Sequence, residues 1–262
     1  MDFAGKVVWI TGASGGIGAG LARRLAREGA LLALSARRAS ELEAVAASLP
    51  EGTRSLVVPG DVMDLAAIPA TLARIESELG PVDVLIANAG ISQRSLVRDT
   101  PLEVYRKLME VDFFAPVAQA QAVLPGMVSR GGGYIVVTSS VAAKYSTPLR
   151  SGYCAAKAAL HGFFDSVRVE HAKDGIAVSL IVAGPIRTDV SVNALTTSVD
   201  ATYGIMDELQ ATGIPVDVAA ETIVAGMRAA EPEIVVAEGP SYDALQLARD
   251  DPKSLYALLA LR

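Results

Sequence analysis

A glycine-rich turn close to the N-terminus limits what this chain can fold into. Residues 7–10 form a short apolar run rich in β-branched residues, and residues 17–25 follow with apolar side chains at helical spacing. The turn between them reads Thr11-Gly12-Ala13-Ser14-Gly15-Gly16-Ile17-Gly18. Glycine permits a tight turn and a close approach of the backbone to a pyrophosphate, and the N-terminus of the following helix offers free N–H groups to that anion. This order predicts a dinucleotide-binding site, although the spacing Gly-x-x-x-Gly-x-Gly differs from the commonest form of the motif.

Strand-like and helix-like segments alternate along the whole chain. The predicted strands are short and continuously apolar, and they cover residues 7–10, 31–35, 54–58, 82–87, 134–137, 176–182 and 233–237. The predicted helices cover a segment that Gly29 ends, residues 40–49, 64–79, a long segment from residue 100, residues 151–173, 217–230 and parts of 241–261. Apolar strands that alternate with helices are typical of a parallel sheet covered on both faces. We therefore predict one α/β domain over residues 1–262.

Three helix features follow from polar residues and prolines. Asp64 can cap the helix over 64–79. Thr100 is the expected cap of the long helix, with Pro101 in its first turn. Pro116 lies inside that long helix and is expected to kink it.

The residues after the second predicted strand bear on the choice of cofactor. NAD sites usually place a carboxylate there to bind the ribose 2′-hydroxyl, whereas this chain has Ala36, Arg37 and Arg38. No carboxylate stands at this position to repel a 2′-phosphate, and the Arg37 guanidinium can bind one through two hydrogen bonds. We therefore predict NADP(H) rather than NAD(H). The alternative is that both arginines only flank the start of a helix.

Tyr153 and Lys157 lie four residues apart, so a helix places both side chains on one face. A tyrosine hydroxyl has a pKa near ~10 in water, and a nearby ammonium favours the phenolate form. Tyr153 is then suited to give a proton to an alkoxide or to take one from an alcohol. Ser140 follows the apolar run 134–137, where its hydroxyl can hydrogen-bond a substrate carbonyl oxygen. A Tyr-x-x-x-Lys pair is common on helix surfaces, and the glycine loop is what favours the catalytic interpretation.

Composition excludes several other functions. The net charge of −6 and a pI near 5.0 argue against nucleic acid as a partner, because no basic patch could neutralise many phosphates. One cysteine and two histidines leave neither an internal disulfide nor a Cys/His zinc site, and we expect no bound metal. The N-terminal residues lack the pattern of a leader peptide, and no apolar run is long enough to span a membrane. We expect a soluble, cytoplasmic protein without a membrane partner.

Together these motifs resemble the short-chain dehydrogenase/reductase family. The matching elements stand in the family's order and spacing: Thr11-Gly12-x-x-x-Gly16-x-Gly18, Asn88-Ala89-Gly90, Ser140, Tyr153-x-x-x-Lys157 and Gly184-Pro185. The resemblance implies a Rossmann-type, doubly wound parallel sheet of about seven strands with helices on both faces. It also implies hydride transfer between a nicotinamide and an alcohol or a carbonyl. The cofactor carries that chemistry, so the protein supplies position and a proton.

The resemblance also implies roles for individual residues. Tyr153 would be the general acid/base, Lys157 would favour its phenolate form and bind the nicotinamide ribose, and Ser140 would orient the substrate oxygen. The positions implied to contact the cofactor are Gly12, Ser14, Gly15, Gly16, Ile17, Gly18, Arg37, Arg38, Asp61, Val62, Asn88, Ala89, Gly90, Tyr153, Lys157, Pro185, Ile186 and Thr188.

Among these, Asp61 and Val62 resemble the pair that holds the adenine ring. Asn88 is implied to steady the central sheet beside the cofactor. Ile186 and Thr188 are implied to hold the carboxamide end of the nicotinamide.

Asp112 departs from the family pattern and is a further candidate catalytic residue. The family usually has an asparagine at this place, which anchors a water that links the lysine to solvent. A carboxylate accepts the same hydrogen bonds but carries charge, so Asp112 can pair with Lys157 and raise the pKa of that lysine. Two consequences of this replacement are possible: it alters the pH optimum, or it has no effect on function. Ala183 stands where the family often has a proline, which bears only on the stiffness of that loop.

Two segments are expected to form the substrate side of the site. Residues 92–99 and 189–215 follow predicted strand ends, where ligands bind in open α/β sheets. The segment 189–215 is long enough for a substrate lid. Its apolar residues and few charges favour a mainly apolar carbonyl or alcohol over a phosphorylated sugar. The sequence around Tyr153 weakly resembles the hydroxysteroid-dehydrogenase-like branch of the family.

Three functions are therefore compared. The first is an NADP(H)-dependent carbonyl reductase or alcohol dehydrogenase. A 3-oxoacyl thioester reductase would share the same site, although the acidic net charge disfavours an acyl carrier protein as a partner. A protein that senses NADP(H) without chemistry would not need Ser140, Tyr153 and Lys157 together. The resemblance further implies a homodimer or homotetramer, in which the apolar run 255–261 either makes a second contact or folds back on the core.

Overall fold

Seven parallel strands form one sheet at the centre of the molecule. The computed structural model describes residues 1–260, and within them the strands follow the spatial order β3-β2-β1-β4-β5-β6-β7. Their bounds are Val7–Thr11 for β1, Leu31–Ala36 for β2, Ser55–Pro59 for β3, Val84–Ala87 for β4, Gly133–Ser140 for β5, Ile176–Ala183 for β6 and Glu233–Val236 for β7. The predicted Rossmann-type sheet of seven strands is confirmed. The central strands are largely apolar because helices cover both of their faces, whereas the edge strand β7 alternates exposed and buried residues.

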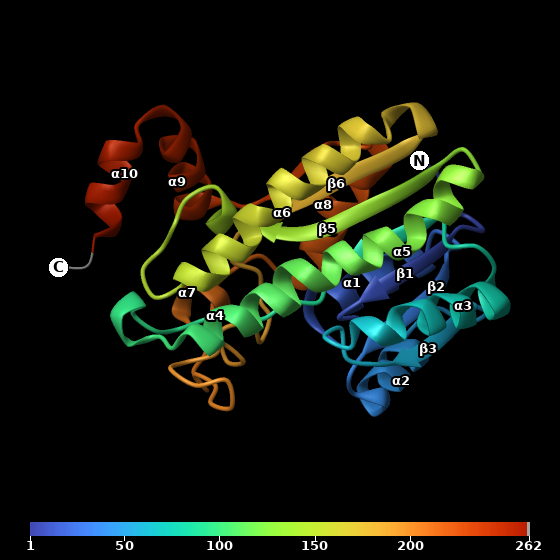
Figure 1. Ribbon diagram of the computed structural model, residues 1–262, viewed down its shortest axis with the longest axis horizontal. Coiled ribbons are helices and arrows are strands. Elements are labelled where there is room, and N and C mark those ends of the chain that lie inside the picture. The colour runs from blue at the N-terminus through green and yellow to red at the C-terminus, as the bar shows by residue number, and fades with distance from the viewer. Residues whose placement is uncertain (261–262) are drawn as a thin grey trace.

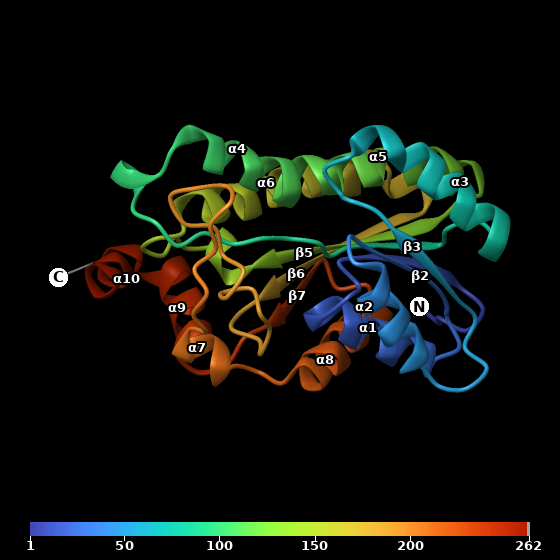
Figure 2. The ribbon, with the colours of Figure 1, turned by 90° about the horizontal axis from the view of Figure 1, so that it is seen from below.

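Helices cover the sheet on both sides and give a three-layer molecule (Figures 1 and 2). One layer holds α1 (Gly16–Ala26), α2 (Ala39–Ala47) and α8 (Val216–Ala229). The other holds α3 (Ile68–Leu79), α4 (Leu102–Met109), α5 (Ala115–Ser129) and α6 (Ser151–Glu170). Each layer has its own apolar cluster against the sheet, with Leu21, Leu25 and Ile223 in the first and Ile75, Leu160 and Phe164 in the second.

The sheet order places a crevice beside the glycine loop. Strand β1 pairs with both β2 and β4, so the chain builds the sheet outward from β1 in one direction and from β4 in the other. Ligands bind in open α/β sheets outside the carboxyl ends of the strands at such a reversal point. The site residues predicted from the sequence lie at or just after the ends of strands β1 to β6, except Asp112, Tyr153 and Lys157, which lie on helical segments.

A widened helical turn joins α4 and α5. Residues Glu110–Phe114 form a π turn, in which the Ala115 N–H bonds to the Glu110 carbonyl. Pro116 lies in the first turn of α5 and has no N–H for the carbonyl four residues back, so a regular α-helical turn is disfavoured there. The irregularity that Pro116 predicts therefore takes the form of a π turn.

The prediction that Thr100 caps the long helix was wrong. Helix α4 begins at Leu102 after an extended Pro101, and the Thr100 side chain makes no capping bond. Its hydroxyl instead donates to the Leu96 carbonyl at 2.6 Å. Asp64, the predicted cap of the helix that ends at Leu79, instead caps a 3-10 turn over Leu65–Ala67, where the Ala67 N–H donates to its carboxylate at 3.3 Å. Helix α3 follows directly at Ile68 and has no side-chain cap of its own.

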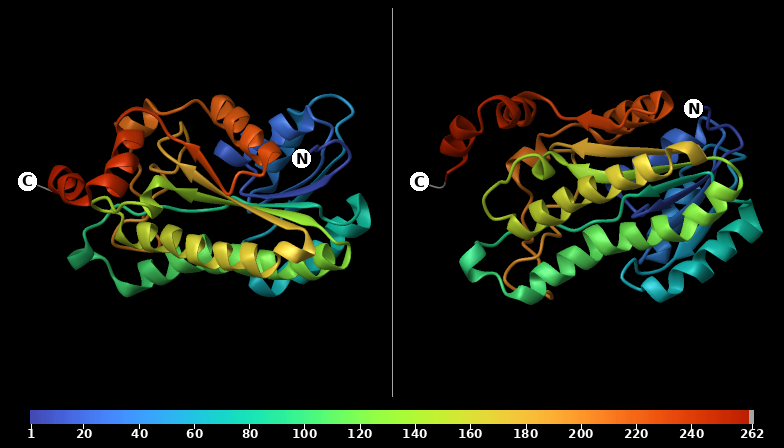
Figure 3. Two further views of the ribbon diagram at one scale, coloured as in Figure 1. Left: turned by 90° about the horizontal axis from the view of Figure 1, so that it is seen from above. Right: turned by 45° about the horizontal axis from the view of Figure 1, so that its top comes forward.

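The segment 189–215 and the C-terminal helices lie toward the carboxyl ends of the strands (Figure 3). The segment contains the short helix α7 (Glu208–Ala211), and single bridges join Leu195 to Gln93 and Ile214 to Ile186. Helices α9 (Gly239–Asp250) and α10 (Pro252–Leu259) follow β7, and Leu255 packs in an apolar cluster with Val141 and Tyr145. The predicted helical run reaches residue 261, which lies outside the described residues. Among residues 1–260, no helix is both long and apolar enough to cross a membrane.

Candidate active site

The glycine loop leaves room for a ligand at the N-terminus of α1. Gly12 and Gly16 have φ angles of +67° and +51°, which favour glycine. A Cβ on Gly18 would lie 2.4 Å from the Gly12 carbonyl oxygen, so a side chain there cannot be accommodated. A Cβ on Gly15 would meet nothing within 4 Å, and the first turn of α1 contains no acidic residue. The loop therefore offers free N–H groups and open space to an anion.

Asn88 ties the end of β4 to the glycine loop. Its side-chain amide donates to the Thr11 and Gly12 carbonyls at 3.0 and 3.3 Å, and its carbonyl oxygen accepts from the Thr138 hydroxyl at 3.0 Å. A Cβ on Gly12 would lie 2.8 Å from the Ala89 Cα, so these two backbones touch. Asn88 and Ala89 thus fix β1, β4 and β5 at the carboxyl edge of the sheet.

The residues predicted around the adenosine lie at the ends of β2 and β3. Arg37 and Arg38 are both exposed directly after β2. Arg38 forms an ion pair with Glu41 one helical turn later, whereas Arg37 makes no hydrogen bond or ion pair with the described residues. Asp61 follows β3 and accepts from the Met63 N–H at 3.0 Å, and the neighbouring Val62 is half-buried.

Pro185, Ile186 and Thr188 follow the end of β6. Ile186 is buried and bridges to the segment 189–215, and its carbonyl accepts from the Gln210 side chain. The same amide contacts the Thr188 hydroxyl at 3.2 Å. A Cβ on Gly16 would lie 3.0 Å from the Thr188 methyl group, so Thr188 stands over the glycine loop.

Ser140 ends β5 opposite Ala183 of β6. Its hydroxyl donates to the Ala183 carbonyl at 3.1 Å and accepts from the Ala142 N–H at 3.1 Å. The hydroxyl is thus held at the carboxyl edge, and it can exchange its Ala183 bond for one to a substrate oxygen.

Tyr153 and Lys157 share one face of α6, as their spacing predicts. The Lys157 ammonium lies 5.7 Å from the centre of the Tyr153 ring and donates to the Thr138 carbonyl at 3.0 Å. The Tyr153 ring packs in a small apolar cluster that includes Leu108 of α4 and Leu195 of the segment 189–215. The hydroxyl-bearing ring therefore faces an apolar region beside a buried cation.

Asp112 forms a fully buried ion pair with Lys157. The Lys157 Nζ lies 3.1 Å from Asp112 Oδ1, with side-chain exposures of 4% and 0%. The Ile91 N–H donates to the same oxygen at 3.1 Å, and Asp112 Oδ2 is buried without a hydrogen-bond partner among the described residues. Burial acts to lower the pKa of Lys157, but the Asp112 carboxylate and Tyr153 outweigh it and hold that pKa above its ordinary value. Burial raises the pKa of Asp112, and the Lys157 ammonium opposes this rise.

Gly90 makes room for this ion pair. A Cβ at this position would lie 2.6 Å from Asp112 Oδ1 and 3.2 Å from the Lys157 ammonium. The glycine of the Asn-Ala-Gly motif is therefore required by side-chain packing, since its φ angle is not positive.

A family model described as short chain dehydrogenase matches residues 6–198. The chain belongs to the short-chain dehydrogenase family. Its members are oxidoreductases that use nicotinamide cofactors.

Individual relatives agree with this assignment. The chain is 40% identical to "Dehydrogenase/reductase SDR family protein 7-like" of Drosophila melanogaster over 98% of its own length and 80% of that protein. It is 44% identical to "Dehydrogenase/reductase SDR family member 7" of Homo sapiens, over 78% of this chain and 62% of the human protein. The crystal structure of a short-chain dehydrogenase from Streptomyces avermitilis superposes with a TM-score of 0.83 at 28% identity, covering 97% of this chain and 96% of that one.

Sequence reasoning missed one buried polar residue of this dehydrogenase site. Gln93 is fully buried, its carbonyl oxygen accepts from the Gly152 N–H at 2.8 Å, and its amide donates to the Thr100 hydroxyl at 3.2 Å. It thereby links the segment after β4 to the start of α6, next to Tyr153. The sequence offered one signal for Gln93, which is its position three residues after the Asn-Ala-Gly motif.

A charged cluster on the substrate side was also missed. Asp207 in the segment 189–215 accepts from Arg150 at 2.9 Å and forms an ion pair with Arg94. The Arg94 guanidinium lies 5.5 Å from the centre of the Tyr203 ring. Asp207 thus ties the segment to the loops that precede α4 and α6.

Proposed function

We propose that this dehydrogenase interconverts an alcohol and a ketone or aldehyde on a mainly apolar small molecule, with NADP(H) as its cofactor. The observation that carries the proposal is the joint position of Ser140, Tyr153 and the buried Lys157–Asp112 pair at the carboxyl edge, beside the glycine loop. A bound nicotinamide dinucleotide would supply or accept the hydride.

The side chains of this chain supply position and a proton. The Ser140 hydroxyl can donate to the substrate oxygen and hold it beside the Tyr153 hydroxyl. Tyr153 gives its proton to that oxygen in reduction and takes it back in oxidation. The Lys157 ammonium stabilises negative charge on the Tyr153 oxygen, and Asp112 keeps Lys157 charged at neutral pH.

NADP(H) is supported by the end of β2. Arg37 is exposed there without a hydrogen-bond or ion-pair partner among residues 1–260, and no carboxylate follows the strand to repel a 2′-phosphate. Arg38 is already paired with Glu41, so Arg37 is the better-placed ligand. An apolar substrate is supported by the surroundings of Tyr153, where Ile91, Leu195 and Val199 pack.

The first test is oxidation of NADPH by the purified chain against a panel of ketones, aldehydes and 3-oxoacyl thioesters, with NADH in parallel. Turnover with NADPH supports the proposal and identifies the substrate class, and thioesters alone would favour the 3-oxoacyl reductase. Tyr153→Phe should lower kcat by about 10²- to 10⁴-fold while NADPH still binds, since one general acid is lost. Tyr256→Phe on the exposed face of α10 is the matched control. Tight NADPH binding without turnover by the wild type would favour a sensor.

Arg37→Ala tests the cofactor assignment. Loss of charge-assisted hydrogen bonds, each worth ~1.5–3 kcal/mol, should raise KM for NADPH by about 10- to 100-fold and leave KM for NADH unchanged. Arg27→Ala, which removes an exposed arginine at the end of α1, is the control. A wild-type preference for NADH would refute the NADP(H) assignment.

A further inference from the structure

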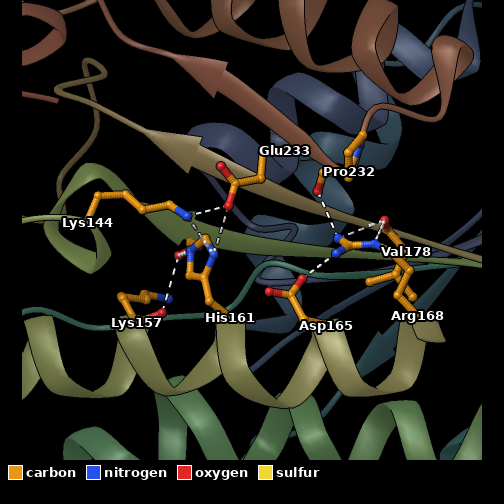
Figure 4. Close-up of polar contacts among 9 residues, drawn as sticks. Lys144, Lys157, His161, Asp165, Arg168, Val178, Pro232 and Glu233 are labelled. Atoms are coloured by element: carbon orange, nitrogen blue, oxygen red, sulfur yellow. Dashed lines mark hydrogen bonds and ion pairs between the residues drawn. The ribbon is translucent and has the colours of Figure 1, made fainter. Parts of the chain in front are cut away.

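A chain of polar contacts runs from Glu233 of β7 through Lys144 and His161 to the backbone of Lys157 (Figure 4). His161 is at its centre, one helical turn beyond Lys157 on α6, and its side chain is only 12% exposed. The His161 Nε2 lies 2.9 Å from the Ser139 hydroxyl oxygen, which lies 3.4 Å from the Lys157 carbonyl oxygen. On the other side of the ring, Nδ1 lies 3.1 Å from the Lys144 ammonium and 3.2 Å from a Glu233 carboxylate oxygen.

Lys144 sets the direction of these hydrogen bonds. An ammonium has only donors, which favours the neutral tautomer in which Nδ1 accepts from Lys144 and Nε2 carries the proton; in the other tautomer, Nδ1–H would donate to Glu233 instead. The Nε2–H then donates to Ser139, and the Ser139 hydroxyl donates to the Lys157 carbonyl. Glu233 holds Lys144 in place through a direct ion pair. In this tautomer each member of the chain of contacts has one donor or acceptor role.

Ser139 links this chain of polar contacts to the active site. Ser139 stands in β5 between Thr138, whose carbonyl accepts from the Lys157 ammonium at 3.0 Å, and Ser140, which is proposed to hold the substrate oxygen. A displacement of Ser139 therefore moves both groups. We propose that His161 is a positioning residue that acts through Ser139 to keep the Lys157 ammonium and the Ser140 hydroxyl in their working positions, and this inference rests on the proposed function.

The charges around His161 favour the neutral ring. Lys144 faces it from the turn after Val141–Ala143, Glu233 from β7, and Asp165 from the next turn of α6; β5 contributes only the Ser139 hydroxyl. Burial lowers the pKa of His161, Lys144 lowers it further, and the two carboxylates only partly oppose this. Below that lowered pKa, Nδ1 carries a proton and can no longer accept from Lys144. His161 then no longer holds Ser139 in position, so kcat should fall at acidic pH.

His161→Gln and His161→Leu separate positioning from packing. Glutamine can accept from Lys144 and donate to Ser139 but does not titrate, so His161→Gln should retain most of kcat at neutral pH and show a weaker fall of kcat in acid than the wild type. His161→Leu should lower kcat at neutral pH by about tenfold with unchanged NADPH binding, since small misplacements of catalytic groups are costly. His171→Leu, at the end of the same helix and 29% exposed, is the matched control.

Lys144→Met covers the case in which His161→Leu does not fold, because Lys144 lies nearer the surface. Without the ammonium, His161 Nδ1–H can donate to Glu233, so the pKa of His161 should rise and the acid fall of kcat should move to higher pH. If the wild type turns over but both His161→Gln and Lys144→Met keep the acid limb of the wild type, the inference alone is overturned. Absence of any wild-type turnover would overturn the proposed function and the inference with it.

Discussion

Replacing Asp112 with asparagine should move the alkaline limb of the pH–rate profile to lower pH and lower the melting temperature. The carboxylate lies 3.1 Å from the Lys157 ammonium, so the attraction at an effective dielectric constant near 20 is about 5 kcal/mol. This attraction exists only while Lys157 is charged. Its loss therefore lowers the pKa of Lys157, and the ammonium is lost earlier as the pH rises.

Stability should fall as well. The burial cost of the carboxylate disappears when Asp112 becomes neutral asparagine, but the Lys157 ammonium stays buried without its counter-ion. The asparagine oxygen can still accept from Lys157 and from the Ile91 N–H. We expect the free energy of unfolding to fall by about 3–5 kcal/mol, because one charge of a buried pair is left uncompensated.

The assay is kcat/KM against pH for the wild type and Asp112→Asn, with thermal unfolding at neutral pH. Glu103→Gln, on the exposed side of α4, removes one carboxylate from the same helical region and should leave both measurements unchanged. A profile of Asp112→Asn that superposes on the wild type would refute the electrostatic reasoning. Asp112 would then be a silent replacement for the family asparagine.

Two further predictions concern neighbouring residues. Gly90→Ala should destabilise the fold by about 1–3 kcal/mol, because the new methyl group would overlap Asp112 Oδ1 at 2.6 Å; urea unfolding measures this, and an unchanged midpoint would show that the ion pair shifts at no cost. Asp207→Asn should speed hydrogen exchange of the Arg94 and Leu195 amides by at least about tenfold, since the carboxylate that ties the segment 189–215 to two arginines is lost. Unchanged exchange would show that backbone bridges alone hold that segment.

The sheet and the cofactor loop were predictable because their signals are local. Apolar runs, helical periodicity and a glycine loop in strand–helix context each lie within a short window, and the seven strands fall where these runs do. Tyr153 and Lys157 were equally accessible, since four-residue spacing determines a shared helix face. The prediction that Thr100 caps the long helix was wrong because its hydroxyl donates to the Leu96 carbonyl, and this bond competes with capping.

The rest of the site depends on residues that are far apart in the sequence. Asp207 meets Arg94 only because the segment 189–215 folds back over the end of β4. Glu233 reaches His161 only because β7 pairs with β6 at the edge of the sheet. Single charged residues of this kind carry no periodic pattern, so their partners become visible only when the topology is known.

The π turn before α5 has a consequence for helical phase. Val104 and Val123 are both buried, yet an uninterrupted α-helix would set them about 100° apart around its axis. The additional residue in Glu110–Phe114 takes up that difference, so the buried side of α4, which packs with Tyr153, lies in line with the buried side of α5, which packs against the sheet. Asp112 lies inside the turn that makes this adjustment. The same turn therefore sets the rotation of α5 relative to α4 and the position of the carboxylate next to Lys157. An insertion or deletion in this turn would alter both at once.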